Sequence, residues 1–117
     1  MSKNLFVVKR SVPRFPFVAQ AEVVAVGDGK RFVASISELS AKGCYLETLE
    51  RLAVGAELLL LVRHGGSECD LVGKAIYQRE GKGMGVAFDE MAVEQRYILA
   101  SWLAELARKQ PDAYGTN

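Results

Sequence analysis

Short runs in which apolar and polar residues alternate, separated by glycine-rich segments, fill most of this sequence between residues 17 and 88. An alternation of period two places every second side chain on the same side of a β-strand. The first two runs are joined by Gly27-Asp28-Gly29-Lys30, whose composition is typical of a hairpin turn. The runs expected to form strands are residues 17–26, 31–37, 44–48, 57–63, 69–79 and 84–88. About six short strands at this spacing predict a mainly β chain that folds into a small antiparallel barrel or sandwich.

The last part of the sequence has a different pattern, which predicts one C-terminal α-helix over residues 91–109. This segment contains neither glycine nor proline, and its apolar residues recur at helical spacing, at Met91, Ile98, Leu99, Trp102, Leu103 and Leu106. Asp89 is the expected N-cap of this helix. Tyr97, Leu103 and Ala107 widen the apolar face, so either the helix makes a broad contact with the core or it also forms the seam of a homodimer.

Length, charge and hydropathy restrict the class of protein. A chain of 117 residues forms one domain and buries a core without a disulfide or a metal. It carries 15 basic and 14 acidic residues, and this net charge of +1 argues against a strongly basic nucleic-acid binder. The longest aliphatic run, residues 58–62, is far shorter than the roughly 20 residues that cross a membrane. We expect a cytoplasmic protein without membrane insertion, in which Cys44 and Cys69 are free thiols.

The sequence lacks the residues that catalysis or metal binding would need. Its one histidine, His64, lies in a glycine turn, where we expect it to be solvated, and a pairing with Cys69 would still lack a third, orienting group. One histidine and two separated cysteines do not have the spacing of a zinc site. The glycines of residues 81–85 are better explained by a tight turn and close strand packing than by a dinucleotide-binding loop. We therefore expect no catalytic residue, no metal and no cofactor.

The chain begins with a basic segment. Its first 20 residues carry four basic side chains and no acidic one. Three of these basic residues, Lys9, Arg10 and Arg14, surround Pro13, which prevents a regular helix and favours an extended arm. The planar guanidinium group is suited to bidentate hydrogen bonds with phosphates and purine edges. The alternative interpretation is a solvated start of the first strand.

A second group of polar residues follows the second predicted strand, in the pattern Glu38-x-Ser40-x-x-Gly43, which we interpret as a loop. A carboxylate can accept hydrogen bonds from the N1 and N2 groups of guanine, and a hydroxyl can donate to a phosphate or a base. A glycine lets the backbone approach a ligand closely. The alternative is an ordinary loop, in which the serine caps the local backbone and the glycine provides a positive φ.

Taken in order, these motifs resemble the PilZ domain family, small β-barrel receptors for cyclic diguanylate (c-di-GMP). The family's Arg-x-x-x-Arg motif, often preceded by another basic residue, corresponds to Arg10 and Arg14 with Lys9. Its Asp/Asn-x-Ser-x-x-Gly motif corresponds to residues 38–43. A glycine at the middle of the family pattern is matched by Gly55, and a glycine-led apolar strand precedes a C-terminal helix, as it does here. The resemblance extends over residues 9–108.

The resemblance implies a six-stranded antiparallel β-barrel with a C-terminal helix. The chain would then divide into a basic arm at residues 1–15, a barrel with its helix at residues 16–110 and a flexible tail at residues 111–117. It implies a c-di-GMP sensor and adaptor whose arm changes conformation on binding and which signals to a partner protein. The ligand-binding residues that it implies are Lys9, Arg10, Arg14, Glu38, Ser40 and Gly43.

One residue departs from the family pattern. Where the family has Asp or Asn, this chain has Glu38, whose carboxylate lies one methylene further out and needs another rotamer to reach a guanine. A second interpretation therefore stays open, a PilZ-like protein-interaction module that does not bind the nucleotide. A third, an unrelated barrel that binds single-stranded nucleic acid, requires aromatic side chains along a basic track. Acidic residues through the rest of the chain interrupt such a track.

Overall fold

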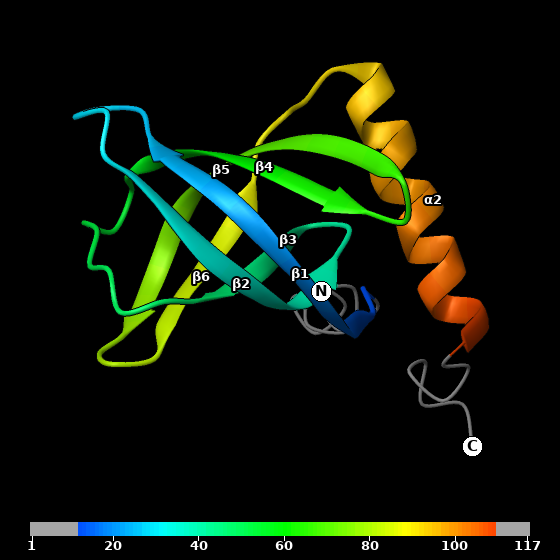
Figure 1. Cartoon of the computed structure of the whole chain (residues 1–117), viewed down its shortest axis with the longest axis horizontal. Helices are drawn as coiled ribbons and strands as arrows, with labels where there is room; N and C mark the ends of the chain where they lie inside the picture. Colours follow the sequence, from blue (N-terminus) through cyan, green and yellow to red (C-terminus); the bar gives the residue numbers. More distant parts are fainter. Residues whose placement is uncertain (1–11, 110–117) are drawn as a thin grey trace, which may run out of the picture.

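A computed structural model describes residues 12–109, which form a closed barrel of six antiparallel strands with a helix beside it (Figure 1). The elements are β1 (Arg14–Ala25), β2 (Arg31–Ser40), β3 (Gly43–Glu47), β4 (Glu57–His64), β5 (Ser67–Arg79), β6 (Gly83–Phe88) and α2 (Val93–Lys109). Around the barrel the strands follow the order β1-β2-β3-β6-β5-β4. The six-stranded antiparallel barrel and the C-terminal helix expected from the sequence are confirmed.

The alternation that predicts the strands also fills the core. Every second residue of β4 is buried, and the same holds along most of the longer strand β1. The largest side chains enclosed in the core are Phe15, Ile36, Leu39, Leu46, Leu58, Leu60, Leu71 and Met84. Cys44 and Cys69 lie among them as free thiols, as expected. Because the barrel closes on itself, side chains from the inner faces of all six strands meet in one core.

Helix α2 packs against the barrel mainly through Leu99, Trp102 and Leu106, which are buried. The indole ring of Trp102 stacks on Phe17 with a centroid distance of 5.8 Å, and the ring of His64 lies edge-on to it at 5.4 Å. His64 is thus half-buried in an aromatic cluster, and the prediction that it is a solvated turn residue is wrong. The contact between a strand end and a distant helix explains this difference.

The other apolar residues of α2 divide between the core and the solvent. Leu103 and Ala107 are partly buried against the core, whereas the side chain of Tyr97 is 76% exposed. The widened apolar face is therefore in part a broad core contact. Within residues 12–109, no helix has the length and hydrophobicity needed to cross a membrane.

Helix α2 begins at Val93, so the prediction that Asp89 is its N-cap is wrong. The backbone amide of Asp89 instead donates to the carbonyl oxygen of Val72, at 2.8 Å. Its carboxylate accepts a hydrogen bond from the ammonium group of Lys74, at 3.4 Å. Asp89 thus continues the pairing of β6 with β5 and cannot at the same time cap the helix.

Strand β1 begins at Arg14 and not at residue 17, because Phe15 is buried like Phe17 and extends the alternation. Arg14 therefore belongs to the barrel. Residues 1–11 and 110–117, which include Lys9, Arg10 and the predicted tail, lie outside the described residues.

The segment predicted as a loop over residues 38–43 is instead the end of a hairpin. Strand β2 continues through Ser40 and β3 starts at Gly43, so only Ala41 and Lys42 connect them. The polar motif therefore lies on two paired strands and the tight turn between them.

Candidate functional site

A hollow of about 470 Å³ lies beside the hairpin that joins β2 to β3. Its volume is in the range of pockets that hold small molecules. Four of the six predicted site residues line it, namely Arg14, Glu38, Ser40 and Gly43. The other two, Lys9 and Arg10, lie outside the described residues. The remaining walls come from β3, β5 and β6 and include Tyr45, Ile76, Tyr77, Gly85 and Ala87.

Arg14 and Glu38 lie on neighbouring strands at the mouth of this hollow. Arg14 is paired with Ser40 across the β1–β2 ladder, and Glu38 is paired with Pro16. The Nη1 atom of Arg14 lies 3.9 Å from Oε1 of Glu38, and the two side chains are 74% and 48% exposed. An ion pair this exposed contributes only about 0–1 kcal/mol. Both groups are therefore available to another partner at little cost.

Ser40 is engaged within its own turn. Its hydroxyl oxygen accepts hydrogen bonds from the backbone amides of Lys42 and Gly43, both at 3.1 Å. The same hydroxyl can donate to the carbonyl oxygen of Gly43, which lies 3.3 Å away. The residue is only 8% exposed. These contacts match the local capping role that sequence analysis offered as the alternative. Ser40 therefore holds the turn in shape on the floor of the hollow.

Gly43 is required by the approach of two strands. Among the described residues, positive φ angles occur at five glycines, and Gly43 is not one of them. A Cβ atom at this position would instead collide with the backbone carbonyl oxygen of Val86 on β6. The alternative interpretation, in which Gly43 provides a positive φ, is therefore wrong on this point. The close packing of β3 on β6 is what excludes a side chain here.

Irregularities in strand pairing surround the hollow. The register shifts between β1 and β2 at Pro16/Ala19, between β2 and β3 at Ile36/Glu38, and between β5 and β6 at Ala75/Tyr77. An extra residue in a strand reverses its inward–outward alternation, and such bulges often lie beside binding sites. In β2 the buried residue that follows Ile36 is Leu39, so Glu38 is exposed. The bulge thus turns the Glu38 carboxylate away from the core.

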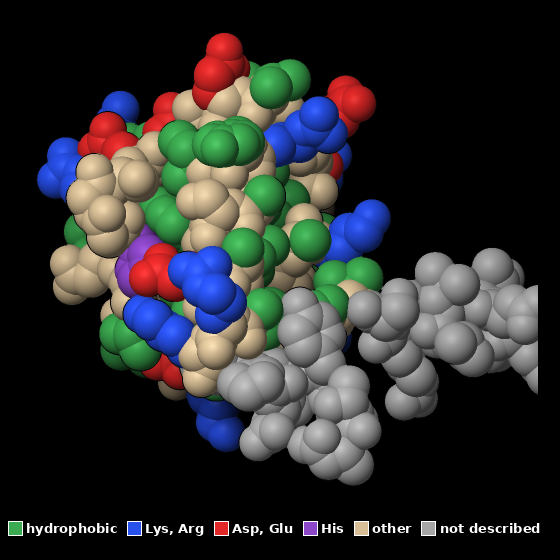
Figure 2. Space-filling view, turned by 90° about the vertical axis from the view of Figure 1, so that its right-hand side faces the viewer, with side chains coloured by type: hydrophobic (Ala, Val, Ile, Leu, Met, Phe, Trp, Pro, Cys, Tyr) green, Lys and Arg blue, Asp and Glu red, His purple; other side chains and the backbone are tan. Residues whose placement is uncertain are grey.

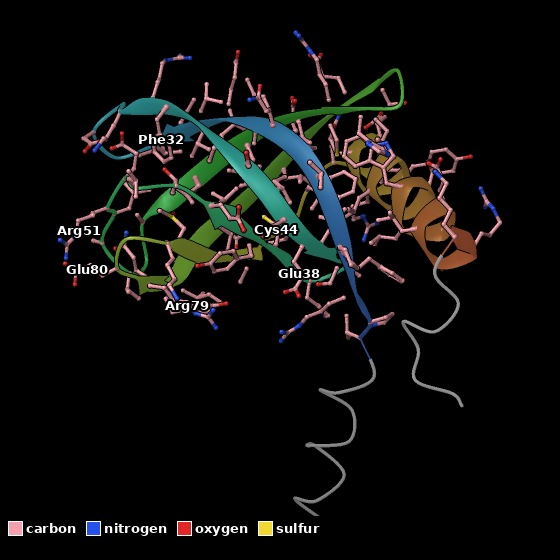
Figure 3. All side chains as sticks on the ribbon, turned by 60° about the horizontal axis from the view of Figure 1, so that its bottom comes forward. Phe32, Glu38, Cys44, Arg51, Arg79 and Glu80 are labelled. Carbon is pink, nitrogen blue, oxygen red and sulfur yellow. The ribbon has the colours of Figure 1, made fainter. Side chains whose placement is uncertain are left out.

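Two tyrosines and an arginine, which the sequence motifs do not include, extend this surface. The rings of Tyr45 and Tyr77 lie 6.3 Å apart, and the guanidinium carbon of Arg79 lies 5.6 Å and 5.9 Å from their centroids. Figure 3 shows Arg79 and Glu38 on the same side of the barrel. The tyrosine rings line the hollow. Tyr45 lies between two buried residues of β3, so the alternation of side chains along a strand indicates that it faces outward.

The hydroxyl group of Tyr45 is buried and has no hydrogen-bond partner among the described residues. Tyr77 packs directly over Gly85, where a Cβ atom would collide with its ring. The expectation that the glycines of this hairpin allow close packing therefore holds at Gly85. The hollow thus combines a charged mouth with an aromatic wall.

The buried thiols are unsuited to nucleophilic chemistry. Burial raises the pKa of Cys44 to about 12, and burial together with the charge of Asp70 raises the pKa of Cys69 to about 11. The thiol of Cys69 also lies 3.4 Å from the carbonyl oxygen of Gln95, to which it can donate. Within residues 12–109, His, Cys, Asp and Glu side chains form no group of three or more that could hold a metal ion.

The sequence profile of the family described as "PilZ domain" matches residues 9–105, which is most of the chain and contains both polar motifs. None of the curated proteins matches this sequence.

Solved structures with the same fold include the PilZ domain of CeSA from a cellulose-synthesizing bacterium. It is 19% identical over 80% of this chain and 96% of that chain, with a TM-score of 0.64. The PilZ domain of YcgR from Escherichia coli, solved with c-di-GMP, is 14% identical over 93% and 99% of the two chains, with a TM-score of 0.70. The inhibitor of motility MotI/DgrA from Bacillus subtilis is 16% identical over 89% and 52%, with a TM-score of 0.63. At these identities the likeness concerns the fold.

Proposed function

The chain belongs to the PilZ domain family, and from this premise we propose that it binds c-di-GMP in the hollow beside the β2–β3 hairpin. PilZ domains are ligand-binding and adaptor modules, generally receptors for c-di-GMP. The observation that carries the proposal is that Arg14, Glu38 and the Ser40 turn, which come from two separate sequence motifs, line one hollow. The proposed ligand-binding residues are Lys9, Arg10, Arg14, Glu38, Ser40 and Gly43.

The charged residues at the mouth would make the polar contacts with the nucleotide. The guanidinium group of Arg14 presents a planar set of donors that fits phosphate oxygens and the Hoogsteen edge of guanine. The Glu38 carboxylate would accept from the N1 and N2 groups of a guanine. Since the ion pair between them is exposed and weak, the ligand can replace it without a large loss of stability.

The hairpin would contribute shape more than hydrogen bonds. The hydroxyl group of Ser40 already has backbone partners in the turn, so its role in our proposal is to fix the position of the backbone that the ligand meets. Tyr45 and Tyr77 add an aromatic wall on which a flat base can stack.

The proposed output follows from the position of the basic segment directly before β1. Ligand binding would draw Lys9 and Arg10 toward the nucleotide bound at Arg14. The resulting change in this segment is the signal that a partner protein would recognise. In this proposal the chain acts as a sensor and adaptor and not as an enzyme.

A second candidate function is a protein-interaction module that does not bind the nucleotide. The observation that favours it is the departure at Glu38, whose carboxylate oxygen here lies 3.9 Å from the guanidinium group of Arg14. If this pair is retained, the mouth of the hollow offers an approaching phosphate no net positive charge from these two residues.

Isothermal titration of the full chain with c-di-GMP decides between these functions. We expect saturable binding with a dissociation constant of about 1 µM or below, which corresponds to about 8 kcal/mol. GTP and a short single-stranded RNA serve as controls, and we expect neither to bind. No heat with c-di-GMP would favour the interaction module, and binding to RNA alone would overturn both functions.

Glu38→Asp restores the residue type of the family motif, and we expect it to tighten c-di-GMP binding. The shorter side chain loses less rotamer freedom on binding, which corresponds to about two- to fivefold in affinity. Glu57→Asp, on β4 and outside the hollow, is the matched control and should leave the affinity unchanged. Unchanged or weaker binding by Glu38→Asp would show that Glu38 does not contact the ligand in the proposed way.

A further inference from the structure

The hollow beside the β2–β3 hairpin has a third charged residue, Lys42, which lies in the turn between the two strands. Among the described residues that line this hollow, charged side chains occur at Arg14, Glu38 and Lys42. The formal charges of Arg14 and Glu38 are opposite, so the described lining is net positive only because of Lys42. The turn therefore offers an anionic ligand a positive charge beyond that of the Arg14–Glu38 pair.

Lys42 is exposed, and within residues 12–109 its side chain forms no ion pair. By contrast, Lys30, Lys74 and Lys109 each pair with a carboxylate. Figure 2, which views the side of the molecule on which α2 lies, also shows basic side chains beside acidic ones. Because no ion pair among the described residues has to break, binding an anion costs Lys42 mainly the rotamer freedom of its side chain.

The backbone of Lys42 is held on both sides, so its position at the hollow is fixed. Its amide group donates to the hydroxyl oxygen of Ser40, at 3.1 Å. Its carbonyl oxygen accepts a hydrogen bond from the amide group of Phe88, at the end of β6, at 2.8 Å. Ser40 is also the partner of Arg14 across the β1–β2 ladder. Lys42 is thus two positions from the residue that pairs with Arg14, and both cations lie at the same end of the hairpin.

We propose that Lys42 binds a phosphate group of c-di-GMP in the hollow, beside Arg14. This inference rests on the proposed function and adds a ligand-binding residue that neither sequence motif specifies. An ammonium group is a compact charge with three donors, so it can bind phosphate oxygens without the planar geometry of a guanidinium group. Arg14 can then direct its planar set of donors at the Hoogsteen edge of a guanine while Lys42 holds the phosphate.

Isothermal titration of Lys42→Met with c-di-GMP measures this contact. We expect binding about tenfold weaker than that of the wild type, at the low end of the range for a charge-assisted hydrogen bond, because an exposed lysine has to be ordered. Lys42→Arg keeps the positive charge and should bind within about threefold of the wild type. Since the side chain is exposed, neither variant should change the far-ultraviolet circular dichroism spectrum.

Two further variants separate a direct contact from a general effect of charge. Lys82→Met is the matched control, because Lys82 is also an exposed turn lysine with a hydrogen-bonded amide and carbonyl group, but it does not line the hollow. This control should bind c-di-GMP like the wild type. The double variant Ala41→Lys with Lys42→Met moves the charge by one position, to an exposed residue that does not line the hollow. It should bind as weakly as Lys42→Met alone.

The outcomes distinguish this inference from the proposed function. If the wild type binds c-di-GMP and Lys42→Met binds equally well, the inference is wrong and the proposed function stands. The inference is also wrong if Lys82→Met loses as much affinity as Lys42→Met, or if Ala41→Lys restores the affinity, because the charge would then act from a distance. A wild type that does not bind c-di-GMP overturns the proposed function and this inference with it.

Discussion

Replacing Arg14 with alanine is expected to reduce c-di-GMP affinity at least about 100-fold, which takes binding beyond the range of a standard titration. The variant removes two charge-assisted hydrogen bonds, each contributing about 1.5–3 kcal/mol, and 1.4 kcal/mol corresponds to a factor of ten. It also leaves the Glu38 carboxylate without its neighbouring cation, so a phosphate near it would be repelled. Isothermal titration of the variant at the concentrations used for the wild type measures the loss.

The fold is expected to tolerate this change. The Arg14 side chain is 74% exposed and its ion pair is weak, so the thermal midpoint should move by only a few degrees. The matched control is Arg63→Ala on β4, which removes another exposed, ion-paired arginine that does not line the hollow. The control should bind c-di-GMP like the wild type. Undiminished binding by Arg14→Ala would refute the site, and an unfolded variant would show that Arg14 is structural.

The barrel could be predicted from the sequence because, in a strand with one buried face, every second residue is apolar. The same rule fails where the alternation changes within a strand. In β2, Ile36 and Leu39 are both buried, although they are three positions apart, because the strand contains an extra residue between them. The alternation of apolar and polar residues does not predict such an insertion. The end of β2 was therefore interpreted as a loop. The prediction that Asp89 caps the helix fails for a similar reason, because its partners Val72 and Lys74 lie on another strand.

In the candidate site, residues that belong to short motifs could be predicted, whereas residues that meet only through the fold could not. Short sequence motifs are sufficient to predict Arg14, Glu38, Ser40 and Gly43 as site residues. Tyr45 and Tyr77 lie near each other because their strands, β3 and β5, flank the same strand, β6. No local sequence pattern contains this strand order. His64 likewise meets Phe17 and Trp102 through contacts between distant segments. The surroundings of these side chains are determined by tertiary packing, which local sequence patterns do not describe.

The stability of the domain is expected to depend on Trp102, through which α2 joins the barrel. The indole is only 3% exposed and packs against Phe17 and His64. Removing such a side chain leaves a cavity, and Trp102→Ala should lower the free energy of unfolding by about 3–5 kcal/mol. For a domain of this size the thermal midpoint should fall by roughly 10–25 °C. Because Trp102 is the only tryptophan, the transition is followed by circular dichroism and not by fluorescence.

The same helix offers a matched control for this result. Tyr97 is also aromatic but is 76% exposed, so Tyr97→Ala should change the free energy of unfolding by no more than about 0.5 kcal/mol. The two variants and the wild type are compared at the same protein concentration. If α2 and the barrel unfold together, Trp102→Ala gives one transition at a lower temperature. A decrease smaller than about 1 kcal/mol would mean that the packing of α2 on Phe17 and His64 contributes little to folding.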